Sequence, residues 1–229
     1  MEHVYARADM APGKELSRSH TMYILLKRLF DLLVSGLMLA ILSPLLAGIA
    51  VAIKLTGRGP AIFRQERAGQ NGRPFAFYKF RTMRPDADPF GPSPKSGADP
   101  RLTKIGRFLR ESSLDELPQL VNILRGDMSL VGPRPLYVSQ AAEWDERQRK
   151  RLLVKPGLTG LAQIFGRGGL TREEKLELDV KYVEQARLGL DARVLLATFV
   201  RVFARKGIYE KRYSRAECTR GQTRATREE

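Results

Sequence analysis

Residues 32–53, LLVSGLMLAILSPLLAGIAVAI, carry no charge and form the strongest structural signal in the chain. A helix needs about 20 apolar residues to cross a bilayer, and this run has that length. The run does not match a secretory signal peptide, because a long polar segment precedes it and no small-residue cleavage site follows it. A buried helix of a soluble protein is the less favoured alternative, given the length and the lack of charge. We therefore expect a retained membrane helix.

Ser43 and Pro44 lie near the middle of this run. Proline removes one backbone hydrogen bond and clashes with the preceding turn, so it tends to kink the helix. Basic residues flank both ends and give no preferred orientation: Lys27, Arg28, Lys54 and Arg58. Two topologies stay open on these residues, namely a spanning helix with a tolerated proline and a re-entrant hairpin with both ends on the cytoplasmic face.

The composition narrows the chemistry. The 229 residues fit one soluble domain plus a membrane element, and the formal charge of +15 favours a polyanionic partner such as nucleic acid or an acidic leaflet. The single cysteine, Cys218, lies in a polar tail, and His3 and His20 lie in a stretch without apolar periodicity. These positions argue against a disulfide framework and a cysteine zinc site. They also argue against a histidine metal site and a nucleophile that a histidine activates. Carboxylates must carry any catalysis.

The rest of the chain reads as an α+β, mostly helical domain. Apolar runs at 61–63 and 75–80, separated by a glycine-containing turn at 69–72, predict a β-hairpin, and the Pro-, Gly- and Asp-rich segment 86–100 predicts a loop. We divide the chain into a flexible leader, a membrane helix, a compact cytosolic domain and a polar tail, with these bounds: 1–22, 23–56, 57–210 and 211–229.

Three helices are expected within the cytosolic domain, from their apolar spacing: 114–125, 173–186 and 192–206. Gly126 should end the first of them. The last is basic and amphipathic, which suits the plane of a membrane interface. An ordinary core-facing helix with a solvated basic side fits it equally well.

Asp115 and Glu116 are the candidate catalytic pair. With Ser113 as N-cap and Glu116 three residues later, the pair also fits a capping box that starts helix 114–125. Its surroundings are unusually cationic, with basic residues next to turn-forming ones: Lys79, Arg81, Arg107, Arg110, Arg134 and Lys155. One carboxylate can attack phosphorus to form an acyl phosphate, while a second shares in holding Mg²⁺.

Arg134 lies between Pro133 and Pro135. Arginine forks match phosphate oxygens bidentately, and the two prolines restrain the backbone that carries this one. A rigid surface turn is the alternative. No Walker A loop or G-x-G-x-x-G fingerprint is present, so side chains must hold any phosphate.

Taken together and in order, seven motifs between about residue 27 and residue 206 resemble the bacterial sugar transferases, and more narrowly the monotopic phosphoglycosyl transferases. They are the following: Lys27-Arg28, Ser43-Pro44, Lys79-Phe80-Arg81-Thr82-Met83, Ser113-Leu114-Asp115-Glu116-Leu117-Pro118-Gln119-Leu120, Gly126-Asp127-Met128-Ser129, Gly132-Pro133-Arg134-Pro135 and Lys155-Pro156-Gly157-Leu158-Thr159-Gly160. The resemblance implies that a sugar 1-phosphate passes from a UDP-sugar to undecaprenyl phosphate, which releases UMP and starts a lipid-linked glycan.

The resemblance also implies roles for single residues. Asp115 would be the nucleophile that forms a covalent phosphosugar intermediate, and Glu116 would help to hold Mg²⁺ and position Asp115. Phosphate-binding roles fall on four basic residues, the last two with less support: Arg110, Arg134, Lys79 and Arg81. Ser43-Pro44 would break a re-entrant helix in the bacterial inner membrane, which places the catalytic domain 57–210 on the cytoplasmic face.

Several expectations concern partners and size. The chain should be one of the small members, without the extra spanning helices that larger members have. The loop 86–100 and the turn 166–169 are where we expect sugar selectivity, because loops near a rigid site usually vary specificity. The sugar, the glycan pathway and the oligomeric state are left open.

Two other classes were weighed. A nucleic-acid-binding protein is supported only by the isoelectric point of about 10.3 and by the basic patches. A non-catalytic membrane scaffold does not explain the prolines around Arg134. We expect no nucleic-acid partner, because an anionic leaflet accounts for the basic charge equally well.

Overall fold

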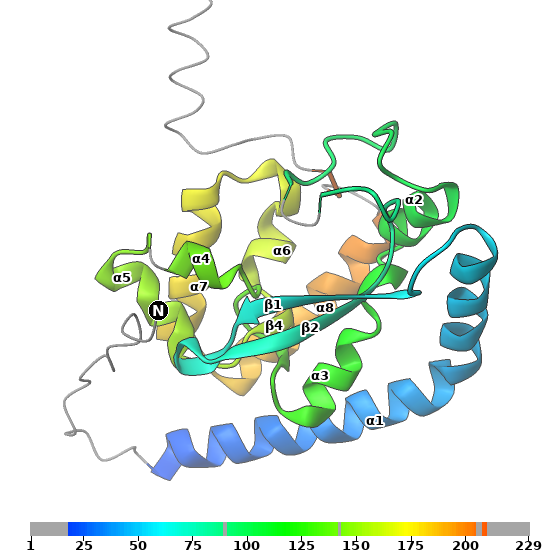
Figure 1. The fold of residues 1–229 in the computed structure, drawn as a ribbon. Coiled ribbons are helices and arrows are strands. Elements are labelled where there is room, and N and C mark those ends of the chain that lie inside the picture. Colours follow the sequence, from blue (N-terminus) through cyan, green and yellow to red (C-terminus); the bar gives the residue numbers. More distant parts are fainter. Residues whose placement is uncertain (1–17, 89–90, 142, 205–207, 210–229) are drawn as a thin grey trace, which may run out of the picture.

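A computed structural model of the chain describes residues 18–88, 91–141, 143–204 and 208–209. The first element is a long helix, α1 (Arg18–Leu55), which runs along one side of the molecule (Figure 1). Residues 18–22, which the sequence analysis placed in a flexible leader, are therefore helical. Residues 1–17 and the expected polar tail 211–229 lie outside the described residues.

The surface of α1 is apolar and exposed. The segment Thr21–Leu55 is long and apolar enough to cross a membrane, and just 11% of its most apolar window is buried in the protein. Leu33, Leu37 and Ile41 each expose more than half of their surface. A core helix of a soluble protein would bury such residues, so this alternative does not fit.

Pro44 lies inside α1, and the helix continues through it. The Ser43 hydroxyl donates a hydrogen bond to the Ala40 carbonyl at 2.9 Å, within the turn that the proline disturbs. Figure 1 shows that the C-terminal part of α1 turns away from the direction of its N-terminal part. Because proline both lacks an N–H and crowds the preceding turn, it is the physical cause of such a bend. The segment is one bent helix.

Polar contacts attach the N-terminal half of α1 to the rest of the protein. The Arg28 guanidinium donates to the carbonyls of Ile123 and Leu124 at 2.7 and 3.0 Å. The buried Asp31 carboxylate accepts from the Leu130 amide at 2.9 Å. Arg28 thus satisfies carbonyls at the end of another helix, which otherwise lack partners.

Lys27 makes a further link. Its ammonium group forms a 2.8 Å ion pair with Asp191, which also accepts hydrogen bonds from Tyr23 at 3.0 Å and Tyr182 at 2.7 Å. The basic flank of the apolar run is therefore bound to the globular part.

The predicted β-hairpin is confirmed. Strands β1 (Ile62–Ala68) and β2 (Pro74–Phe80) pair antiparallel with Ile62 opposite Phe80, and the turn η1 (Gln70–Gly72) joins them. Asn71 and Gly72 have φ values of 56° and 74°, a region that Asn and Gly adopt at little cost.

The segment around the acidic pair differs from the prediction of one helix over 114–125. Helix α2 (Lys104–Glu111), which was not predicted, is followed by a single turn η2 (Leu114–Glu116) and then by α3 (Gln119–Arg125). Ser113 has a φ of 59°, and its side chain does not cap the turn, so the capping-box interpretation is wrong. Two neighbours explain the break: Ser112 closes α2, and Pro118 supplies no N–H for a continuous helix. Gly126 ends α3 as expected, at a φ of 91°.

Two short parallel strands form the centre of the domain. Strand β3 (Ser129–Val131) pairs with β4 (Gly157–Thr159), and the connection between them contains α4 (Val138–Ala141), α5 (Glu146–Arg149) and η3 (Lys150–Leu153). The sequence did not predict this parallel pair, because three-residue strands carry no readable periodicity.

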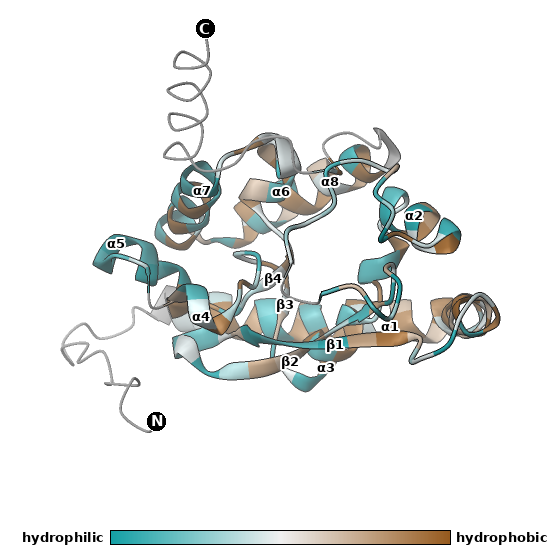
Figure 2. Ribbon diagram, turned by 45° about the horizontal axis from the view of Figure 1, so that its top comes forward, coloured by the Kyte–Doolittle hydropathy of each residue, from teal (hydrophilic) through white to brown (hydrophobic). Residues whose placement is uncertain are grey.

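Four further elements complete the described chain: α6 (Leu161–Phe165), η4 (Arg167–Gly169), α7 (Arg172–Gln185) and α8 (Leu188–Ala204). The last two confirm the expected helices 173–186 and 192–206, although α8 begins four residues earlier. Figure 2 shows α6, α7 and α8 gathered on the side of the β3–β4 pair that faces away from the hairpin. The described residues of the loop 86–100 contain neither helix nor strand.

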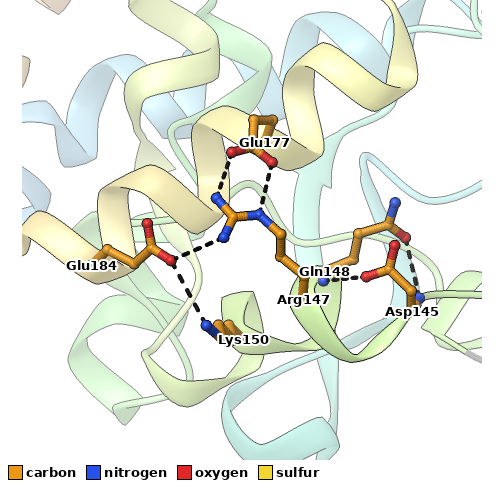
Figure 3. Close-up of polar contacts among 6 residues, drawn as sticks. All are labelled: Asp145, Arg147, Gln148, Lys150, Glu177 and Glu184. Carbon is orange, nitrogen blue, oxygen red and sulfur yellow. Dashed lines mark hydrogen bonds and ion pairs between the residues drawn. The ribbon is translucent and has the colours of Figure 1, made fainter.

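A polar cluster links α5 to α7 (Figure 3). Arg147 binds both carboxylate oxygens of Glu177, at 2.6 and 3.2 Å, and contacts Glu184 at 3.4 Å. Because these groups are exposed, water and salt screen them and they contribute little to stability. Arg147 lies just before Arg151 in the chain, and Arg151 is a residue of the site described below.

Two apolar clusters form the core. The larger one joins the hairpin, α3, β3 and the helices α6 to α8, and its buried members are the following: Phe77, Leu120, Ile123, Met128, Leu130, Val131, Leu161, Tyr182 and Val194. The smaller one joins the C-terminal part of α1 to β2 and α2 through Ile49, Ile53, Ala61, Phe80 and Leu109. The turn η2, with the acidic pair, connects α2 of the smaller cluster to α3 of the larger one.

Candidate active site

Asp115 lies in the turn η2 and is almost fully buried, with 6% of its surface exposed. Burial raises the pKa of its carboxyl to about 6, and the negative charge of Glu116 acts in the same direction. The positive charges of Lys79, Arg110 and Arg134 oppose the rise. Asp115 is therefore ionised above about pH 6, in surroundings that leave it poorly solvated.

Glu116 is held differently. The Arg134 guanidinium binds its two oxygens as a fork, with Nη2 2.5 Å from Oε1 and Nη1 3.4 Å from Oε2. Burial alone would raise the pKa of Glu116, but the Arg134 charge and hydrogen bonds outweigh it and lower that pKa. Neighbouring carboxylates whose pKa values move in opposite directions are suited to different tasks.

The backbone of Arg134 is fixed from within the protein. Its carbonyl accepts a hydrogen bond from the Arg151 guanidinium, which is buried and forms a 2.7 Å ion pair with the equally buried Asp179 of α7. A buried charge is tolerated when it is paired in this way. Arg134 thus lies just after β3, in a segment that buried side chains hold in place. A turn at the protein surface would not have such buried contacts.

Close backbone packing holds the same segment from the other side. The Gly132 amide donates to the Thr159 carbonyl at 2.8 Å, and the Gly157 amide donates to the Pro133 carbonyl at 2.8 Å. A Cβ at Gly132 would lie 2.5 Å from the Lys155 carbonyl oxygen, so a side chain does not fit there. The motifs around residues 132–135 and 155–160, distant in the sequence, are therefore one structural unit.

Lys79 and Arg110 complete the cationic surroundings of Asp115. Lys79 lies on β2, and burial lowers its pKa to about 8, with the neighbouring charge of Arg110 acting in the same direction and Asp115 against it. Its ammonium group also lies 5.0 Å from the centre of the Phe63 ring. Arg110 comes from the last turn of α2. The structure thus gathers Lys79, Arg110 and Arg134 around Asp115 from three separate elements.

Arg81 does not belong to this group. Its buried guanidinium donates to the carbonyls of Arg58, Gly57 and Ile53, at 2.6, 3.2 and 3.4 Å; Ile53 is in the last turn of α1, and the other two lie just after the helix. Among the described residues, no hydrogen bond or ion pair joins it to Asp115 or Glu116. Its geometry is that of a helix-terminus partner, because the last carbonyls of a helix lack partners within the helix.

Arg167 is a site residue that the sequence reasoning missed. One of its nitrogens donates to the Ser113 hydroxyl at 3.2 Å. Burial lowers the pKa of Arg167, and the negative charge of Glu116 opposes that shift. Its other terminal nitrogen, Nη1, is buried and has no hydrogen-bond partner within the described part of the chain. The available signal was an arginine within the glycine-rich turn Gly166–Gly169, comparable to the proline-flanked Arg134.

A pocket with a volume of about 110 Å³ opens beside the acidic pair. Ser113, Glu116, Leu117 and Arg167 line one part of it, and residues of β4, α6 and α8 line the rest.

Asp115 and Glu116 are the carboxylates of the site that could hold a magnesium ion. Among the described residues, no group of three or more His, Cys, Asp or Glu side chains could hold a metal by itself. Magnesium, however, usually binds through one or two carboxylates together with substrate phosphates and water. No hydrogen bond to the Asp115 carboxylate is found within the described ranges, so its oxygens remain open to such an ion.

Comparison with known proteins agrees with this geometry. The family model described as bacterial sugar transferase matches residues 22–205. A Bacillus subtilis (strain 168) protein named "Uncharacterized sugar transferase EpsL" is 43% identical over 194 residues, which cover 85% of this chain and 95% of that protein.

Two other relatives carry a more specific name, "UDP-glucose:undecaprenyl-phosphate glucose-1-phosphate transferase". The protein from Escherichia coli (strain K12) is 40% identical over 193 residues, covering 81% of this chain and 42% of the relative. The one from Caulobacter vibrioides is 42% identical over 201 residues, covering 82% of this chain and 73% of the relative. This chain thus spans less than half the length of the Escherichia coli protein. The match extends from α1 to the end of α8 and includes every element of the site, and the chain therefore belongs to the bacterial sugar transferase family.

Proposed function

We propose that this protein transfers a sugar 1-phosphate from a UDP-sugar to undecaprenyl phosphate, at the cytoplasmic face of the bacterial inner membrane. The observation that carries the proposal is the contrast within the acidic pair: Asp115 is buried and poorly solvated, whereas Glu116 is bound by Arg134. The names of the relatives from Escherichia coli and Caulobacter vibrioides support the two substrates.

The positions of the charges support a two-step transfer through Asp115. An Asp115 carboxylate oxygen attacks the phosphorus that bears the sugar, the new oxygen–phosphorus bond forms, and the bond to the departing phosphate breaks, so that UMP leaves with the electron pair. A phosphate oxygen of undecaprenyl phosphate then attacks the same phosphorus and releases the carboxylate. Lys79, Arg110 and Arg134 stabilise the negative charge on the phosphate oxygens.

Magnesium is part of the proposal. Asp115 and Glu116 would hold the ion, which would neutralise phosphate charge. Arg134 keeps Glu116 ionised and oriented for that purpose.

The membrane location also follows from charge and exposure. The exposed apolar surface of α1 needs an apolar environment, and the lipid phosphate must meet a water-soluble nucleotide at the headgroup level. We place the Ser43-Pro44 bend of α1 in a re-entrant arrangement, with both ends of the helix on the cytoplasmic side, and α8 in the interface.

Trapping of the intermediate tests the proposal. Membranes containing the protein are incubated with magnesium and a panel of UDP-sugars labelled in the sugar, first without and then with undecaprenyl phosphate. We expect label on the protein in the first step, UMP release, and transfer of the label to lipid in the second. Asp115→Asn should abolish all three while it leaves the protein in the membrane. Full turnover by this variant, or label that never reaches the protein, contradicts the covalent route.

A further inference from the structure

Gln163 is a buried amide in the wall of the pocket beside Glu116. It lies in α6, exposes 9% of its surface and lines the cavity together with Arg167. Both of its polar atoms, Oε1 and Nε2, are buried, and neither has a hydrogen-bond partner among the residues that the structure describes. Leaving a buried polar group unpaired costs about 1 to 3 kcal/mol, so such a group calls for a partner from outside the chain.

The pocket is lined by charged, hydroxyl-bearing and apolar side chains, and Glu116, Ser113, Thr159 and Thr198 are among its polar residues. Arg167, with its buried unpaired Nη1, and Arg201 of α8 supply positive charge. Four of the other lining residues are apolar: Leu117, Leu158, Ile164 and Val202. A ligand that fits therefore has an anionic part, a flat or apolar part, and a group that pairs with an amide.

We infer that this pocket receives the uridine phosphate part of the UDP-sugar, and that the Gln163 amide pairs with the imide edge of the uracil ring. The inference rests on the proposed function and deepens it. A side-chain amide has a donor and an acceptor on one edge. Uracil presents N3–H beside a carbonyl oxygen, also on one edge, so Nε2 donates to the carbonyl while Oε1 accepts from N3–H.

Other parts of the two substrates fit less well. The acetamido group of an N-acetylated sugar is a trans amide, whose N–H and C=O point in opposite directions and cannot both meet one amide edge. A polyprenyl chain would fill the apolar walls but would leave both Gln163 atoms unpaired. The pocket therefore favours the nucleobase over the sugar and the lipid.

The test compares inhibitors of transfer by the full-length protein in native membranes. UMP, N3-methyl-UMP and ribose 5-phosphate compete with a labelled UDP-sugar, and label that reaches the lipid is measured, because UMP release cannot be read when UMP is added. N3-methylation removes the imide donor and blocks that edge. In the unchanged protein, UMP should inhibit about tenfold more strongly than N3-methyl-UMP, a factor that corresponds to one lost hydrogen bond in a buried site.

Gln163→Leu should bring the UMP to N3-methyl-UMP ratio close to one and leave inhibition by ribose 5-phosphate unchanged. Gln119→Leu is the matched control: Gln119 is also buried with an unpaired Nε2, but it does not line the pocket, so this variant should keep the wild-type ratio. Gln163→Glu, which is nearly isosteric and lacks the donor, serves if the leucine variant does not fold.

The outcomes separate the two proposals. Equal inhibition by UMP and N3-methyl-UMP in an unchanged, active protein overturns the uracil assignment and leaves the proposed function intact, and it needs no variant. A Gln163→Leu protein that keeps the full preference for UMP has the same meaning. If no UDP-sugar delivers label to lipid in the unchanged protein, the proposed function and the pocket assignment both fall.

Discussion

Arg134 binds both carboxylate oxygens of Glu116, while the backbone carbonyl of Arg134 is itself bound by the buried Arg151. The ion pair of Arg151 with Asp179 thereby connects α7 to the acidic pair through two arginines. Glu116 is consequently ionised and fixed, and its charge adds to the burial that raises the pKa of its neighbour Asp115. The electrostatic state of Asp115 depends in this way on residues that do not touch it.

Removal of the Glu116 charge should shift the pH dependence of transfer. Asp115 must be ionised to attack, so wild-type activity should fall as the pH drops through about 6. In Glu116→Gln the pKa of Asp115 falls, and the acidic limb of the residual activity should move to lower pH, together with a severe loss of rate. The pH profile of kcat/KM checks this. As a control, Glu177→Gln removes an exposed carboxylate far along the chain and should leave the acidic limb of the pH profile unchanged. If the acidic limb of Glu116→Gln is also unchanged, the charge of Glu116 does not raise the pKa of Asp115.

Asp115→Asn should stabilise the folded protein at neutral pH. The folded-state pKa of about 6 lies above the ordinary value of 3.8, so ionisation of Asp115 is disfavoured in the folded state and its stability falls as the pH rises through this window. Relief of that cost should raise stability by on the order of a few kcal/mol at pH 8, and the gain should vanish near pH 4, where Asp115 is protonated anyway.

Thermal unfolding in detergent at both pH values measures the effect. Asp99→Asn is the control of opposite sign, because hydrogen bonds from Arg101 lower the pKa of Asp99 to about 2 and its ionised form is the favoured one. An Asp115→Asn protein that is no more stable at pH 8 than the wild type would show that the burial of this charge is compensated.

Arg81→Met should act on stability rather than on substrate binding. The substitution leaves three carbonyls at and just after the end of α1 without their guanidinium partner, which should cost about 1 to 3 kcal/mol. The KM for the UDP-sugar should stay unchanged in the folded fraction. Arg84→Met, which removes an exposed charge nearby, controls for the loss of charge. A raised KM with unchanged unfolding would instead support the phosphate-binding role that the family resemblance implies for Arg81.

Replacement of Ser43-Pro44 by Ala-Leu should change the topology of α1. Without the proline, the helix regains a backbone hydrogen bond and straightens, which favours a spanning arrangement. His20→Cys in a Cys218→Ser background places one reactive thiol at the N-terminal end of the helix. A membrane-impermeant reagent should label it from the outside in the Ala-Leu protein and only after lysis in the Ser43-Pro44 control. Identical sidedness in both proteins argues against the re-entrant arrangement.

Features with a local cause were predictable from the sequence. Periodicity, charge or glycine within a short stretch of sequence is enough to predict four of them: the uncharged run 32–53, the hairpin on either side of residues 69–72, the helices near 173–186 and 192–206, and the helix end at Gly126. The error over 114–125 is also local. The apolar spacing is helical, but Pro118 and the left-handed Ser113 divide the segment, and the divided form leaves Asp115 in a buried turn.

The sequence by itself therefore determined the long apolar helix, the hairpin and the types of residue available for the chemistry, because each depends on neighbours in the chain. Only the tertiary structure decided which cations surround Asp115, that Arg81 instead closes the end of α1, and that Arg167 and Gln163 share a pocket with Glu116. Those relationships join residues from separate helices and strands. They depend on packing and on electrostatic fields that act through space, which a single sequence does not contain.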